Sequence, residues 1–170
     1  MERTIQVRHV EMKVKADFEA FIKNLEASLG RFDPSFCSGI EKDPAGVRKR
    51  IEAAAGEEDF LIFDIRDHGR LLSVIGAPRK ARQYVVGNPL IAVTMTGLDI
   101  RAGLYAPLRL YVYEAEDGST MAEFDLPSSL FCQFNDPEIT AIGESLDKKL
   151  FSLLEKAETA GMLAGLTPGQ

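Results

Sequence analysis

The stretch 83–95, QYVVGNPLIAVTM, constrains the fold more than any other part of the chain. Residues 84–86 have the aromatic and β-branched composition of a strand, and Gly87 interrupts that run. Asn88 is a favoured helix N-cap, and Pro89 suits the first helical turn. The stretch therefore predicts a strand that turns directly into a helix. The backbone N–H groups at such a helix start are a common place for a ligand.

Composition and charge exclude several classes of protein. A chain of 170 residues with 45% hydrophobic and 27% charged residues is typical of a soluble globular domain with its own core. No apolar run resembles a signal peptide or a membrane span, so we expect a cytoplasmic protein with no membrane partner. The net charge of −6 argues against a nucleic-acid partner. The one dense basic cluster, residues 79–82, is interpreted as the solvent face of a strand.

Cysteine and histidine are too sparse and too scattered to indicate a metal site. Cys37 and Cys132 lie far apart, and His9 and His68 form no ligand spacing with them. We therefore predict two free thiols and no metal. The sequence also lacks the GxGxxG, P-loop and HExxH motifs, so no cofactor is expected.

The periodicity of apolar residues predicts a single α+β domain over residues 1–160, followed by a flexible C-terminal tail over residues 161–170. The expected sheet is mixed and largely antiparallel, with helices packed mainly on one face. We expect strands at 4–14, 60–66, 71–75, 79–86, 108–114 and 120–125, and helices at 17–29, 44–55, 89–97 and 137–160.

The string YVVGNPLIAVTMTGLDIRAGLYAPLRLYVYEAEDG resembles the family known as domain of unknown function 302. The features that carry the resemblance are the GNP motif at residues 87–89, the apolar stretch ending in a proline at 104–107, and the hairpin at 112–118. The resemblance covers roughly residues 10–126. It implies a compact α+β fold, a dimer, and no established activity.

The expected topology suggests one polar site. If strands 60–66, 71–75 and 79–86 alternate in direction, the Asp67-His68-Gly69 turn and the Gly87-Asn88-Pro89 corner lie at the same end of the sheet. The residues that would gather there, beside a helix N-terminus, are Asp67, His68, Arg70, Tyr84 and Asn88. Such a group suits a small anionic or carbonyl-bearing ligand. Each residue also has a structural interpretation, as a turn former, a helix cap or an edge residue.

A second candidate, Asp125 with Ser128 and Ser129, would need a nearby histidine to activate a serine. The same topology places Asp125 at the end opposite His68, and there is no GxSxG motif. Ser128 is therefore interpreted as capping a turn.

These observations favour a non-catalytic, homodimeric domain that binds a small molecule or acts as an accessory protein. One alternative is an enzyme, a hydrolase or isomerase, that uses His68 as its acid–base residue. The other alternative is a protein-interaction module that uses the acidic C-terminal helix.

Overall fold

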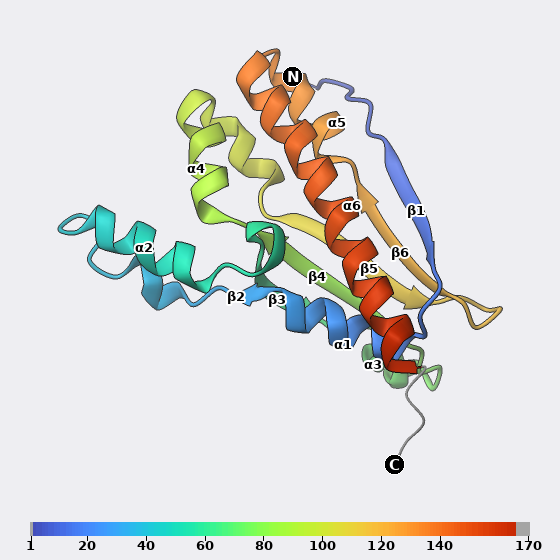
Figure 1. Cartoon of the computed structure of the whole chain (residues 1–170). Coiled ribbons are helices and arrows are strands. Elements are labelled where there is room, and N and C mark those ends of the chain that lie inside the picture. The colour runs from blue at the N-terminus through green and yellow to red at the C-terminus, as the bar shows by residue number, and fades with distance from the viewer. Residues whose placement is uncertain (1, 166–170) are drawn as a thin grey trace.

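The computed structural model describes residues 2–165 and shows a six-stranded sheet in the order β1-β6-β5-β4-β3-β2 (Figure 1). The strands are β1 (His9–Val14), β2 (Gly30–Arg31), β3 (Leu61–Arg66), β4 (Ala81–Gly87), β5 (Leu108–Glu114) and β6 (Thr120–Asp125). Every neighbouring pair is antiparallel except β2 with β3, which is parallel. The mixed, largely antiparallel α+β domain predicted from the sequence is confirmed.

Two helices, α1 (Phe18–Ser28) and α6 (Pro137–Gly165), pack against each other over one face of the sheet (Figure 1). Asp17 caps α1 by accepting a hydrogen bond from the Ala20 N–H at 3.0 Å. The apolar stripes of both helices are buried against alternate residues of the strands, which is what a 3.6-residue period facing a two-residue period produces. The largest fully buried side chains of this core include Phe21, Leu25, Tyr84, Leu110, Leu150 and Leu153.

A second, smaller apolar cluster lies at the β2 edge, where α2 (Pro44–Ala54) packs through Val47 and Ile51 against Leu61. The remaining segments are short. They are η1 (Pro34–Cys37), η2 (Glu57–Asp59), α3 (His68–Leu71), η3 (Leu72–Ile75), α4 (Pro89–Leu98), η4 (Ile100–Tyr105), α5 (Pro127–Phe131) and η5 (Cys132–Phe134). Three of them, α4, η4 and α5, stand at the end of the sheet where β4 finishes (Figure 1).

The predicted strand 71–75 is wrong, because this segment is helical. Asp67 caps α3 through the Arg70 N–H at 2.7 Å, and η3 continues the turn to Gly76, which has a left-handed φ of 73°. Strand β3 therefore pairs directly with β4, with Leu61 opposite Gly87 and Arg66 opposite Gln83. The apolar residues that suggested a buried strand are exposed: Leu71 by 65%, Val74 by 83% and Ile75 by 74%.

The two chain ends also differ from expectation. The first strand begins at His9 instead of residue 4, and α6 continues through Gly165, so residues 161–165 are helical and not a tail. The rest of the predicted tail, 166–170, lies outside the described residues. None of the helices over residues 2–165 has the length and apolarity needed to cross a membrane. Cys37 and Cys132 are free thiols, as predicted.

Candidate functional site

The corner between β4 and α4 has the structure that its sequence predicts. Asn88 caps α4, its Oδ1 accepting from the Leu90 N–H at 2.8 Å, and Pro89 occupies the first turn. The other half of the Asn88 amide is also used, because Nδ2 donates to the Asp59 carbonyl at 2.8 Å. The side chain is only 9% exposed. Asn88 is therefore a structural residue that joins the helix start to η2.

A cavity of about 280 Å³ opens at this corner. Its walls come from segments far apart in the sequence: the residue after β2, the first half of β3, the end of β4, the first two turns of α4, η4, the start of β5, α5 and α6. The lining residues are mostly aliphatic or aromatic and include Phe63, Ile91, Ala92, Met95, Leu108 and Phe131. Gly87 contributes backbone to the wall, where a side chain would otherwise enter the space beside Pro107 and Phe63.

Two aromatic rings form one side of the cavity. Phe63 stacks on Phe32 with ring centroids 4.6 Å apart and planes 26° apart, and both rings line the space. Phe63 is placed there by a β-bulge, since the β3–β4 register shifts between Ile62 and Asp64. Stacked rings of this kind offer a flat apolar surface.

The cavity offers a ligand little polarity. Among the described residues, none of those lining it is charged, and the Asn88 side chain already has partners for both its amide oxygen and its amide nitrogen. A charged ligand would lose its hydration without gaining a partner ion, which is unfavourable. The arrangement suits an uncharged, largely apolar molecule.

The polar site predicted from the sequence is not assembled. Arg79 donates its N–H to the Gly69 carbonyl at 3.2 Å, which places His68 beside the start of β4, whereas Asn88 follows its end. The seven residues of β4 separate these two positions by about 20 Å at ~3.3 Å per residue. The error follows from the helical segment 68–75, because the extra strand assumed there reversed the direction of β4.

The other predicted site residues are dispersed as well. Asp67 and Arg70 lie next to His68 in the chain. Asp67 caps α3, and Arg70 is exposed. His68 is exposed, with its ring 5.9 Å from that of Tyr111. Tyr84 is fully buried in the core and donates its hydroxyl to Glu26 at 2.9 Å. Desolvation of the phenol and the Glu26 carboxylate raise the pKa of Tyr84 well above its ordinary value.

The serines after β6 have structural hydrogen bonds, but Ser128 does not cap the turn as predicted. The Ser128 hydroxyl donates to Asp147 of α6 at 2.5 Å and accepts from Arg8 at 2.8 Å. Ser129 donates to the Leu126 carbonyl at 2.7 Å. Asp125 accepts instead from His9 Nδ1 at 2.8 Å. Within the described residues these groups form no Ser-His-Asp arrangement.

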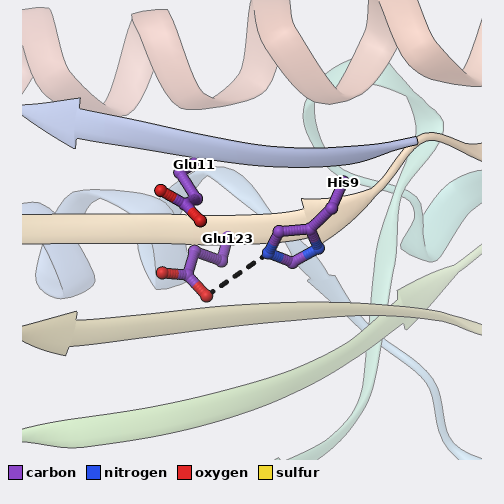
Figure 2. A group of neighbouring side chains, drawn as sticks. All are labelled: His9, Glu11 and Glu123. Carbon is purple, nitrogen blue, oxygen red and sulfur yellow. Dashed lines mark hydrogen bonds and ion pairs between the residues drawn. The ribbon is translucent and has the colours of Figure 1, made fainter. Parts of the chain in front are cut away.

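A polar group that the sequence interpretation missed lies on the sheet face turned away from α1 and α6. Figure 2 shows His9 and Glu11 of β1 beside Glu123 of β6, with the His9 Nε2 atom 3.4 Å from Glu123 Oε2. The hydrogen bond that His9 donates to the Asp125 carboxylate raises the pKa of the His9 imidazole, with a further contribution from Glu123. The alternation of side chains along a strand shows which residues share a face, but it does not show which strands pair. The group forms because β1 pairs with β6, more than a hundred residues away in the sequence.

Comparisons with known proteins support the fold. A search among curated proteins finds no match. The structure is similar to that of an uncharacterised conserved DUF302 protein from Bacillus stearothermophilus, with a TM-score of 0.63 and 20% identity over 88% of this chain and 97% of the other. This likeness shows a shared fold.

A scan against protein families matches residues 38–157 to the family described as domain of unknown function DUF302. The matched region starts later than the resemblance inferred from the motifs and includes most of α6, which that resemblance left out. It spans more than two thirds of the 170 residues. The chain therefore belongs to the DUF302 family.

Proposed function

We propose that this domain is a non-catalytic binding protein whose ligand is a small, uncharged, largely apolar molecule held in the cavity at the β4–α4 corner. The observation that carries the proposal is the cavity itself: about 280 Å³ of space walled by aliphatic and aromatic side chains and positioned by a buried helix cap. Pockets of this composition, with few polar groups, are the usual form of small-molecule sites.

The size of the cavity limits the ligand. A volume of about 280 Å³ lies near the lower end of the range of small-molecule pockets, which begins at about 300 Å³. It equals roughly nine water molecules at about 30 Å³ each, which corresponds to a ligand on the order of ten non-hydrogen atoms. The stacked Phe32 and Phe63 rings favour a flat ligand. Molecules of this size bind with dissociation constants from about millimolar to micromolar.

The surroundings of His68 support binding over acid–base catalysis. Its ring contacts Tyr111, and in the described part of the chain no carboxylate hydrogen-bonds to it. A general base needs both a group that orients it and a substrate site within reach. The cavity is at the other end of β4, and none of its described lining residues titrates near neutral pH.

The proposal includes a cytoplasmic homodimer. The two free thiols are compatible with a reducing compartment. Four exposed apolar side chains of α4 and η4 support the dimer as a surface for association: Val93, Leu98, Ile100 and Leu104. We name these four residues the α4–η4 patch.

Saturation-transfer NMR with two naphthalene derivatives tests the binding site. The neutral 2-naphthol and the anionic naphthalene-2-sulfonate share one ring system and differ in charge. We expect 2-naphthol to bind to the wild type at least tenfold more tightly than the sulfonate, because the cavity offers no counter-charge. Ala92→Leu, which adds three carbons inside the cavity, should weaken 2-naphthol binding at least tenfold.

The matched control is Thr94→Leu, which adds an apolar side chain at an exposed position of α4 outside this cavity. It should bind 2-naphthol as the wild type does, and melting curves should show both variants folded. Unchanged binding by Ala92→Leu, or equal binding of the neutral and charged probes, would contradict the proposal.

A further inference from the structure

We propose that His9, Glu11 and Glu123 form a site for a divalent cation of the zinc class on the open face of the sheet. The site is separate from the corner cavity, and the inference does not depend on the binding function proposed above. One donor atom from each of the three side chains lies within 4.8 Å of the other two. Spacing along the sequence does not reveal the group, because strand pairing assembles it.

Strand register builds the cluster. Glu11 of β1 lies directly opposite Glu123 of β6, and His9 lies directly opposite Asp125. All four positions alternate with the core-facing residues of their strands, which puts their side chains on the same outward face. Figure 2 shows three of them, His9, Glu11 and Glu123. The donors are therefore held by a regular antiparallel ladder, which is a rigid support.

The distance between two of the donors matches tetrahedral coordination. His9 Nε2 and Glu123 Oε2 are 3.4 Å apart. Two ligands bound at about 2.1 Å to one ion, with a tetrahedral angle between them, are separated by about 3.4 Å. One imidazole nitrogen with two carboxylate oxygens is a donor set that suits Zn²⁺, and three protein ligands leave the fourth position for water.

The neighbouring groups orient the donors. Asp125 binds His9 Nδ1 at 2.8 Å, which leaves Nε2 directed toward the two glutamates. A carboxylate on the far nitrogen of a ligating histidine is a common feature of metal sites. The Tyr113 hydroxyl donates to Glu123 Oε1 at 2.5 Å, so the other carboxylate oxygen, Oε2, is the one that faces His9.

The local charge also favours a cation. Like charges directly opposite one another on paired strands are destabilising, and Glu11 faces Glu123 in this way. Within residues 2–165, neither carboxylate forms an ion pair with a lysine or arginine. The nearest lysine on β1, Lys13, pairs with Asp117 instead. A divalent ion between the two glutamates would remove this repulsion.

Isothermal titration with Zn²⁺ tests the site, on full-length protein with its affinity tag removed and both cysteines alkylated. The wild type should bind one Zn²⁺ per chain. His9→Gln, Glu11→Gln and Glu123→Gln should each weaken that binding at least tenfold. The matched control is His68→Gln, which changes the only other histidine of the chain and should leave Zn²⁺ binding unchanged.

Asp125 is a positioning residue in this proposal, and its variant has a separate readout. Asp125→Ala should weaken Zn²⁺ binding about tenfold and change the tautomer of His9 seen by ¹⁵N NMR, which a merely structural role would leave alone. Circular dichroism checks that each variant is folded. Absence of saturable Zn²⁺ binding by the wild type, or wild-type affinity in His9→Gln, would overturn the proposal.

Discussion

Asn88 shows how the hydrogen bonds of one side chain can fix the wall of a site. Its amide oxygen caps α4 and its amide nitrogen binds the Asp59 carbonyl, and both bonds are 2.8 Å long. Because the residue is nearly buried, removing the side chain leaves two backbone groups without partners. The cavity wall that begins at Pro89 depends on this arrangement.

Asn88→Ala should therefore lower the free energy of unfolding by about 2 kcal/mol, about 1 for the lost cap and about 1 for the lost hydrogen bond to Asp59. Asn88→Ser keeps a capping oxygen but cannot reach Asp59 with an amide, so it should lose about half as much. Urea unfolding followed by circular dichroism measures both. Equal stability of the alanine variant and the wild type would show that the cap is dispensable.

Asp99, at the C-terminal end of α4, provides a pH-dependent test. The Arg101 side chain and its backbone N–H hold the pKa of the Asp99 carboxyl at about 2, below the ordinary value of 3.8. Because the folded-state pKa is lowered, the stabilisation from this carboxylate is fully present above about pH 4 and is lost as the pH falls toward 2.

The stability difference between the wild type and Asp99→Asn should therefore shrink as the pH falls from 4 to 2, since the asparagine keeps a capping oxygen but does not titrate. Thermal melts of both proteins at several pH values measure this. A difference that stays constant over that range would contradict the lowered pKa. In Arg101→Gln, carboxyl NMR should show the Asp99 titration moving back toward its ordinary range.

At the scale of elements, local patterns predict most of the fold but not the segment 68–75. Helix α1, helix α4 and the strands β4 to β6 follow from periodicity, caps and turn residues close to where the structure has them. The run of leucine, valine and isoleucine at 71–75 has strand composition and predicts a strand, whereas the segment is helical and Leu71, Val74 and Ile75 are exposed. Apolar side chains are buried only where another element packs over them. The local composition of a segment does not show whether this happens.

The prediction of the candidate sites from local patterns has the same limit. The Gly87-Asn88-Pro89 corner is readable locally, and the cavity does lie there. The other walls, such as Phe32 and Phe131, come from residues tens of positions away, and their convergence depends on tertiary packing. His9 and Glu123 are separated by 114 positions and meet through strand pairing alone.

Two helical glycines give opposite predictions for the same substitution. A Cβ at Gly143 of α6 would lie 2.9 Å from the Ser128 Cα, so α5 packs directly on that glycine. Gly97 near the end of α4 has open space where its Cβ would be. Gly143→Ala gains up to ~1 kcal/mol of helix propensity but forces an overlap that typically costs 1–3 kcal/mol.

We expect Gly143→Ala to destabilise the protein by about 1 kcal/mol and Gly97→Ala to stabilise it by about 0.5 kcal/mol. Each variant serves as the other's control, because the chemical change is identical and the surroundings differ. Chemical denaturation measures both values. A stabilised Gly143→Ala protein would show that α5 can move away from α6 at little cost.

At the scale of the whole molecule, the two faces of the sheet have different roles. One face is covered by α1 and α6, while the other carries the His9, Glu11 and Glu123 group (Figures 1 and 2). Several exposed apolar side chains lie outside the strands, on η3 and on the α4–η4 patch. The patch adjoins the cavity, since Val93 belongs to both.

The homodimer is accordingly predicted to form through the α4–η4 patch, where Ile100 is 79% and Leu104 is 81% exposed. Contiguous exposed apolar residues mark association surfaces more often than scattered ones do.

Light scattering after size exclusion should give twice the chain mass at tens of micromolar. The double variant Ile100→Glu/Leu104→Glu should give a monomer, because burying two carboxylates in the contact is unfavourable. The control Val74→Glu/Ile75→Glu changes equally exposed residues of η3 at the other end of β4 and should stay dimeric. A monomeric wild type would exclude the dimer. Loss of the dimer in the η3 variant alone would move the contact to that end of the molecule.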